Sequence, residues 1–157
     1  MTAEAEFGVM PLDQIRALDG QALFTGMMEG RYPAPPIFRM LGARFIKVEH
    51  GRVVFDYTPL FDHYNPLGSV HGGIAATMLD GVMGCCIHTT LKAGIGYTTL
   101  EIKVNYVRAM TDKTGPVRVE GKVINVGSRI ATSEGRIHDK EGRLVAHGTT
   151  TCLIFPI

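Results

Sequence analysis

The chain contains one long apolar segment, Gly72 to about Leu91, whose hydrophobic residues recur with the period of an α-helix. Two neighbouring faces of this segment are apolar, one with Ile74, Met78 and Val82 and the other with Ala75, Leu79 and Met83. A helix that is apolar around most of its circumference is buried in the folded protein. The sequence therefore predicts one long central helix that other elements must cover.

After this segment the hydrophobic period changes to two, which is typical of a half-buried β-strand. In "YTTLEIKVNYVR" the inward positions would be Leu100, Ile102, Val104 and Tyr106, alternating with Glu101, Lys103 and Asn105. Three further strands are expected at about 116–126, 129–138 and 143–155. The separators "MTDKTG", "VGS" and "DKEG" are short and rich in turn formers, so we expect these four strands to form an antiparallel meander.

The chain before the central helix predicts a hairpin and a helical extension. In "ARFIKVEHGRVVFDYT" two β-rich runs flank His50-Gly51, where we expect a tight turn. Apolar positions from Leu12 to Met27 suit one or two short helices, which the prolines of "PAPP" at 33–36 end. The expected fold is α+β, one long helix against an antiparallel sheet of about six strands. Because such a sheet covers one face of the helix, a second copy of the chain is the simplest cover for the other.

Composition excludes several classes of protein. The formal net charge is +1, from 16 basic and 15 acidic residues, and nothing favours a nucleic-acid or membrane-surface partner. The apolar segment is interrupted by Asp80, Gly81, Gly84 and His88 and falls short of the roughly 20 apolar residues of a membrane span. The three cysteines have no CxxC spacing, and the first residues lack the pattern of a secretory signal. We therefore expect a cytoplasmic protein with neither disulfides nor zinc.

Asp80 is the only charged residue between His71 and Lys92. An ionised carboxylate on a buried helix is costly unless it is hydrogen-bonded, paired or partly hydrated. One explanation is structural, a buried cap or a support for a neighbouring loop. The other is functional, a general base or nucleophile in a half-buried cleft. We favour the functional explanation because Asp is mostly exposed in folded proteins.

Gly72 and Gly73 lie where the helix starts, so their N–H groups are unpaired donors at the positive end of the helix dipole. This geometry suits an oxyanion hole, although a plain helix start is the simpler explanation of the glycine pair alone. Asp80 lies seven residues after Gly73, roughly 10 Å along a helix that rises about 1.5 Å per residue. One carbonyl cannot easily contact both groups. If both act in one reaction, Asp80 meets the glycines of another subunit, which predicts a homodimer.

The loop before the helix offers weaker candidates. Asn65 can hold a water or a carbonyl with its amide, but "NPLG" is also a good turn sequence. His63 and His71 could act as acid–base groups, and His71 could instead orient the loop. The spacings among His63, His71 and Asp80 match no familiar zinc pattern, so we expect no metal site.

Together these residues resemble a known family. The stretch "HYNPLGSVHGGIAATMLDGVMG" resembles the signature loop and helix of the PaaI-type hotdog-fold acyl-CoA thioesterases, the phenylacetyl-CoA thioesterase-like group. "GYTTLEIKVNYVRAMT" and "VGSRIATSEGRIHDKEGRLVAHGTTTCLI" are similar to that group's central strand and closing hairpins. The resemblance divides the chain into an N-terminal helical extension, 1–34, and a hotdog thioesterase domain, 35–157. It implies a helix wrapped by a curved antiparallel sheet, paired into a dimer and often into a dimer of dimers.

The resemblance also implies roles for individual residues. Asp80 would be the catalytic carboxylate, Gly72 or Gly73 the oxyanion donor, and Asn65 and His71 the groups that place the carbonyl and the loop. Thr99, with Thr98 as the adjacent alternative, falls where relatives have a hydroxyl that assists the water, and Arg129 falls where relatives often contact CoA phosphates. From the residue pattern alone either threonine is an ordinary strand residue and Arg129 a solvated turn residue. His63 and Tyr64 occupy variable positions and receive no catalytic role.

The implied activity is hydrolysis of an acyl-CoA thioester to a free acid and CoA, with CoA as part of the substrate and no separate cofactor. Two alternatives stay open. An acyl-thioester dehydratase or hydratase on the same fold would use a loop histidine such as His63, but its "HFPG" pattern is absent. A non-catalytic acyl-CoA binding module would have little reason to keep Asp80. Met27 and Met28 are candidates to line the acyl pocket.

Overall fold

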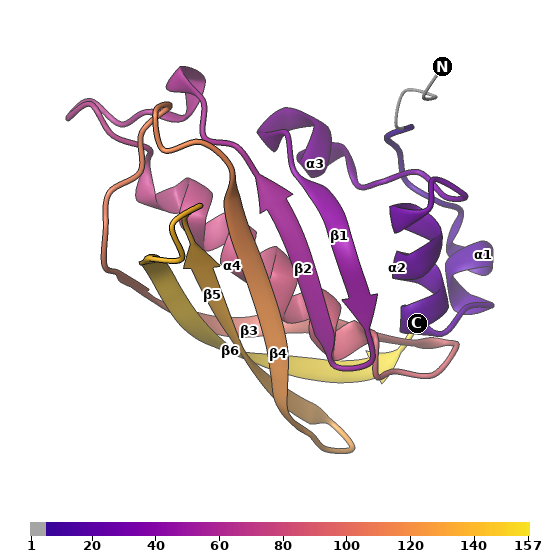
Figure 1. The fold of residues 1–157 in the computed structure, drawn as a ribbon. Coiled ribbons are helices and arrows are strands. Elements are labelled where there is room, and N and C mark those ends of the chain that lie inside the picture. Colours follow the sequence, from indigo (N-terminus) through magenta and orange to yellow (C-terminus); the bar gives the residue numbers. More distant parts are fainter. Residues whose placement is uncertain (1–5) are drawn as a thin grey trace.

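The computed structural model describes residues 6–157, so the first five residues of the expected extension lie outside the described residues. One long helix, α4 (Gly72–His88), lies across a curved antiparallel sheet (Figure 1). The strands are β1 (Arg44–Glu49), β2 (Arg52–Tyr57), β3 (Ile95–Tyr106), β4 (Val117–Val126), β5 (Ile130–His138) and β6 (Leu144–Pro156). Their order in the sheet is β1-β2-β4-β5-β6-β3. The predicted α+β hotdog architecture is confirmed.

The strand order corrects the expected meander. Strands β4, β5 and β6 follow one another as predicted, but β3 pairs with β6 and forms the far edge of the sheet. The residues between Tyr106 and Val117 are therefore a connection that passes the start of α4, where Met110 accepts a hydrogen bond from Val70. A separator rich in turn formers shows where a strand ends. It does not show which strand that strand pairs with, because pairing depends on contacts far apart in the sequence.

Helix α4 begins at Gly72 as predicted but ends at His88, before the expected Leu91. The hydroxyls of Thr89 and Thr90 each donate a 2.7 Å hydrogen bond to the carbonyl three residues earlier. These bonds satisfy carbonyl groups that the last turn of a helix leaves unpaired. The apolar pattern continues to Leu91 because that side chain packs in a small cluster with Ile87 beyond the helix.

Three glycines opposite one another let α4 lie close to the middle of the sheet. Gly121 of β4 pairs with Gly135 of β5, which pairs with Gly148 of β6. A Cβ on Gly121 would lie 2.5 Å from the carbonyl oxygen of Val82, so the helix backbone approaches the strand directly. The largest fully buried side chains in residues 6–157 include Tyr57, Phe55, Met78, Leu79, Met83, Ile87 and Ile137.

The extension contains α1 (Leu12–Arg16) and α2 (Gly20–Met28), and Figure 1 shows α2 beside β1 with α1 on the far side of α2. Helix α2 also reaches the end of α4, where the N–H of Gly20 donates to the carbonyl of Leu91 at 3.1 Å. A third helix, α3 (Pro36–Leu41), was not predicted, because "PAPP" indicated a helix end. Pro36 is the first residue of α3, a position where the missing N–H of proline costs nothing. A short 3-10 turn, η1 (Phe61–His63), precedes the loop that leads into α4.

Candidate active site

Asp80 and Thr99 come together on facing elements of the fold. Thr99 Oγ1, on β3, donates a hydrogen bond of 2.9 Å to Asp80 Oδ1, on α4, and both residues are partly buried. Thr98 is exposed, and it is adjacent on the strand, so its side chain points to the opposite face of the sheet. Thr99, and not Thr98, is therefore the hydroxyl beside the carboxylate.

A β-bulge in β3 turns Thr99 toward the helix. After Thr99, pairing with β6 resumes at Glu101, which leaves Leu100 without a partner. The side chain of Thr150 supports this geometry by donating a 2.7 Å hydrogen bond to the carbonyl of Glu101. Leu100, predicted as an inward position, is 56% exposed, because the extra residue shifts the alternation. Without the bulge, the regular alternation would have turned Thr99 away from Asp80.

The other reactive groups near Asp80 stay protonated. Burial, with smaller contributions from the nearby Cys86 and Asp80, raises the pKa of the Cys85 thiol. Burial also raises the pKa of Tyr97 well above its ordinary value, and the ring lies over Gly84, where a Cβ would be 2.5 Å from the hydroxyl oxygen. A thiol with a raised pKa is a poor nucleophile. Cys85 is therefore a poor candidate nucleophile, and Asp80 is the remaining candidate on this part of the helix.

His71 is the N-cap of α4. Its Nδ1 accepts a 2.8 Å hydrogen bond from the N–H of Gly73, so the neutral ring carries its proton on Nε2. The Gly73 N–H is thus already paired. The N–H of Gly72 forms no hydrogen bond within residues 6–157. Of the two predicted oxyanion donors, Gly72 is the one whose N–H is free for a ligand.

Gly72 also lines a cavity of about 290 Å³ at the start of α4. The lining comes from the helix start, the connection after β3 and the first residues of β6, and is largely apolar: Val70, Ala75, Tyr106, Val107, Met110 and Val145. Backbone hydrogen bonds hold these walls together, from Val70 to Met110 at 2.9 Å and from Val107 to Val145 at 2.8 Å. The free N–H therefore belongs to a residue at the edge of a preformed apolar cavity.

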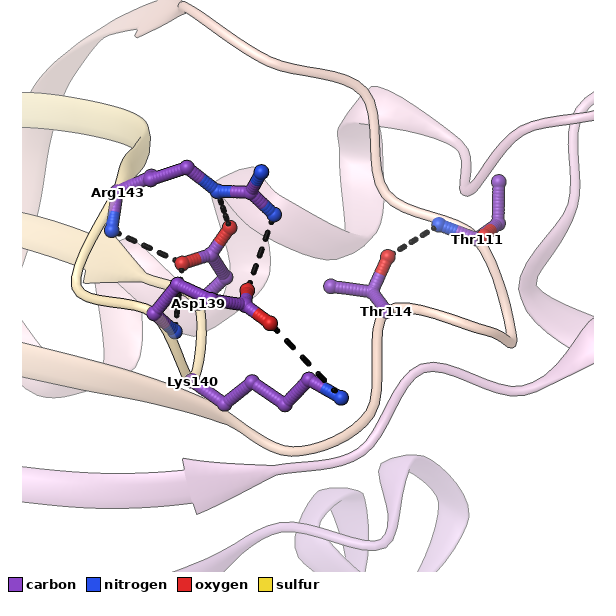
Figure 2. Close-up of polar contacts among 6 residues, drawn as sticks. Thr111, Thr114, Asp139, Lys140 and Arg143 are labelled. Atoms are coloured by element: carbon purple, nitrogen blue, oxygen red, sulfur yellow. Dashed lines mark hydrogen bonds and ion pairs between the residues drawn. The ribbon is translucent and has the colours of Figure 1, made fainter.

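A buried carboxylate holds the turn that leads into β6 and this cavity wall (Figure 2). Asp139 is 5% exposed and accepts hydrogen bonds from the backbone N–H of Arg143 at 2.9 Å and from its guanidinium Nε at 2.7 Å. Burial alone would raise the pKa of Asp139, but the hydrogen bonds from Arg143 outweigh it and the pKa lies below its ordinary value. The neighbouring turn is closed by a 2.8 Å hydrogen bond from the N–H of Thr111 to the hydroxyl of Thr114.

Asn65 is built into its own turn. Its Oδ1 accepts from the N–H of Leu67 at 2.9 Å and of Ser69 at 3.3 Å, and its Nδ2 donates to Ser69 Oγ at 3.2 Å. Within residues 6–157 the second hydrogen of this amide makes no bond. Asn65 therefore stabilises its own turn, and one hydrogen of its side-chain amide remains available to donate to a ligand.

His63 has a structural role that the local sequence pattern did not indicate. Its Nδ1 accepts from the N–H of Leu60 at 3.2 Å, so the hydroxyl of Tyr57, 2.7 Å from the same nitrogen, is the donor. The carbonyl of His63 accepts from the N–H of His71 at 2.8 Å. Burial raises the pKa of Tyr57, which keeps the donating hydroxyl protonated. The buried His63 ring therefore fixes the loop that carries the helix cap. A histidine in a turn-rich loop gave no signal of this, because its partner Tyr57 lies on β2.

The remaining candidates, Arg129, Met27 and Met28, lie away from Asp80 and Gly72 in the fold. Arg129 is exposed in the β4–β5 turn, where its carbonyl accepts from the N–H of Ile154 at 2.8 Å. Met27 and Met28 line a separate cavity of about 320 Å³ between the extension and β1. Within one chain, neither Arg129 nor the methionines join Asp80 or Gly72.

Among residues 6–157, no three His, Cys, Asp or Glu side chains lie close enough together to hold a metal ion. No helix in the same range is long and apolar enough to cross a membrane.

The chain belongs to the thioesterase superfamily. The model of that family matches residues 67–146, just over half of the chain, and this range contains Gly72, Asp80 and Thr99. A protein of Saccharolobus solfataricus, named only provisionally as an esterase, is 32% identical over 114 residues, which cover 72% of this chain and 79% of that protein.

Solved structures agree with this membership. A phenylacetic acid degradation-related protein from Ralstonia eutropha, described as a provisional thioesterase, is 29% identical to this chain and superposes with a TM-score of 0.75. The matched region covers 83% of this chain and 98% of that protein's chain. A hypothetical thioesterase from Streptococcus pneumoniae, solved with coenzyme A, shares the fold at 24% identity and a TM-score of 0.66, over 73% of this chain and 86% of its own. The resemblance to the PaaI-type thioesterases is confirmed, and the chain is an enzyme of the thioester hydrolase class.

Proposed function

We propose that this thioesterase hydrolyses an acyl-CoA thioester to a free acid and CoA, with Asp80 as the catalytic carboxylate. The observation that carries the proposal is the hydrogen bond from Thr99 to Asp80, which orients a lone carboxylate on an otherwise apolar helix. The coenzyme A in the Streptococcus pneumoniae structure supports CoA as the leaving group. The free thiols of Cys85, Cys86 and Cys152 fit a reducing compartment such as the cytoplasm.

The active site is divided between two subunits. Gly72 and Asp80 are eight residues apart on α4, roughly 12 Å at about 1.5 Å per residue, so one chain cannot offer both to one carbonyl. Strand β3 is an edge strand with unpaired backbone groups, and Leu100 is exposed on it. Pairing of two β3 strands would cover this edge and bring Asp80 of one subunit toward Gly72 of the other. The same dimers could associate further into a dimer of dimers.

The reaction begins when the thioester carbonyl oxygen accepts a hydrogen bond from the Gly72 N–H. In the general-base route, Asp80 takes a proton from water, the hydroxide adds to the carbonyl carbon, and negative charge develops on the oxygen. The C–S bond then breaks, and the CoA thiolate takes the proton from Asp80. In the nucleophilic route, Asp80 attacks the carbon itself, the thiolate leaves, and water hydrolyses the resulting anhydride.

The test is release of free CoA thiol by the wild type and by Asp80→Asn over a panel of acyl-CoAs. Asp80→Asn should lower kcat by about 10²- to 10⁴-fold, since this is what acid–base groups contribute, while the circular dichroism and melting temperature stay unchanged. Asp13→Asn, a change on the exposed helix α1, is the matched control and should keep full activity.

Near-normal thiol release by Asp80→Asn would show that Asp80 is not the catalytic carboxylate. Loss of the conjugated absorbance of an enoyl-CoA without thiol release would indicate a hydratase. Tight binding of CoA thioesters without hydrolysis of any of them would indicate a binding module.

A further inference from the structure

We propose that Tyr106 is a positioning residue that holds the oxyanion donor at the start of α4, an inference that rests on the proposed function. Tyr106 is the last residue of β3, and the strand pattern marks it only as an inward side chain. Its position next to Gly72 arises because β3 runs along α4, with Thr99 beside Asp80 and Tyr106 beside the helix start.

Tyr106 and His71 hold the same peptide group from its two ends. The hydroxyl of Tyr106 donates a 3.0 Å hydrogen bond to the carbonyl oxygen of Gly72. The N–H of Gly73, in that same peptide group, donates to His71 Nδ1 at 2.8 Å. The plane of the Gly72–Gly73 peptide is therefore fixed at both its oxygen and its nitrogen.

Two successive glycines at a helix start need such a restraint. Glycine has the widest backbone freedom of any residue, and the N–H groups of a first turn have no partner within the helix. The preceding peptide is held through the carbonyl of His71, which accepts from the N–H of Ile74 at 2.9 Å. With both peptides held, the unpaired N–H of Gly72 keeps one direction, as an oxyanion donor must before charge develops.

The ring of Tyr106 has a second contact with the same residue. A Cβ on Gly72 would lie 3.1 Å from the ring, so glycine is the residue that lets the ring pack against the helix backbone. The side of the ring that does not face Gly72 is open, since Tyr106 is 58% exposed and lines the 290 Å³ cavity. The hydroxyl therefore restrains the donor, while the ring forms part of the cavity wall.

The hydroxyl and the ring can be tested separately. Tyr106→Phe removes the hydrogen bond and keeps the wall, so kcat should fall about 5- to 10-fold while KM stays within about twofold. Tyr106→Ala removes both and should also raise KM. The matched control is Tyr64→Phe, whose hydroxyl bonds Asp112 in the neighbouring loop and does not touch the first turn of α4. This control should keep the wild-type kcat.

Amide hydrogen exchange, followed by NMR, tests the restraint without any substrate. In Tyr106→Phe the amides of Gly73 and Ile74 should exchange faster than in the wild type, while those near the end of α4 are unchanged. Unchanged exchange at Gly73 would refute the restraint, and faster exchange with an unchanged kcat would refute its role in catalysis. If the wild type hydrolyses no acyl-CoA, the proposed function fails, and the exchange rates still decide whether Tyr106 holds the helix start.

Discussion

At the scale of single residues, the carboxylate of Asp80 depends on one hydroxyl for its orientation. Thr99 donates to Asp80 Oδ1, and no salt bridge to Asp80 forms within residues 6–157. A hydrogen bond to a charged group contributes about 1.5–3 kcal/mol, more than a bond between neutral groups. The hydroxyl of Thr99 is therefore expected to matter far more for turnover than its methyl group.

Replacing Thr99 with Val keeps the shape of the side chain and removes the donor. We expect kcat for acyl-CoA hydrolysis to fall about 10- to 100-fold, because Asp80 loses the bond that orients it. Thr99→Ser should recover most of the activity, and Thr98→Val, a change on the opposite face of β3, should have no effect. Equal thiol release by Thr99→Val and the wild type would show that Thr99 has no part in the reaction.

At the scale of elements, the turn between β5 and β6 shows how a site can be supported from a distance. Asp139 accepts bonds from Arg143 within this turn, and β6 then continues to Val145, whose carbonyl holds the connection after β3. Because these bonds lower the pKa of Asp139, the folded state favours the ionised carboxylate more than the unfolded chain does.

Asp139→Asn should therefore make the stability less dependent on pH. A lowered pKa contributes stability above the unfolded pKa, and this contribution disappears as pH falls through the folded pKa. The difference in free energy of unfolding between wild type and variant should be largest near pH 7 and should shrink below about pH 4, close to the ordinary carboxyl pKa. Urea unfolding at several pH values measures this difference. A difference that is the same at every pH would mean that the carboxylate charge does not stabilise the turn.

At the scale of the whole molecule, the proposed site requires two chains. The sheet has a free edge at β3, and the helix face that carries Asp80 also exposes Gly73 and Thr77. A dimer that covers this face would close the cleft around the carboxylate. Within a single chain the sheet covers one side of this apolar helix, and the partner chain would cover the other side.

Mixed dimers can test the division of the site. Gly72→Pro removes the N–H at the first helical position, where proline is tolerated, and Asp80→Asn removes the carboxylate. Each variant alone should be inactive, but co-refolded subunits should recover about a quarter of wild-type activity, because half of random dimers are mixed and each has one intact site. Gly72→Ala is the control for crowding against Tyr106, since it keeps the N–H.

Recovery of activity requires exchange of subunits, so the two variants mixed without refolding should stay inactive. A co-refolded mixture with no activity, despite proven mixed dimers, would place Asp80 and Gly72 of the same chain in one site and overturn the division.

Much of this fold and part of its site follow from local patterns. The start of α4 was predictable because helical periodicity and an N-terminal glycine pair act within a few residues, and the strands were predictable from their period of two. Asp80 and the glycine pair were identified as candidates because a lone charge in an apolar helix is conspicuous. The end of α4 and the helix at Pro36 were missed, because apolar periodicity and proline are each compatible with two local structures.

Local sequence patterns were enough to predict that one buried helix packs on an antiparallel sheet and that Asp80 is a candidate catalytic carboxylate. The folded structure was needed to show that β3 lies at the sheet edge, that a bulge turns Thr99 and not Leu100 toward Asp80, and that the N–H of Gly72 has no partner within residues 6–157. The two groups of features differ in how far apart along the chain the interacting residues lie. Periodicity and capping depend on neighbours along the chain, whereas the pairing of β3 with β6, the bulge held by Thr150 and the bond from Tyr106 to Gly72 join residues more than thirty positions apart.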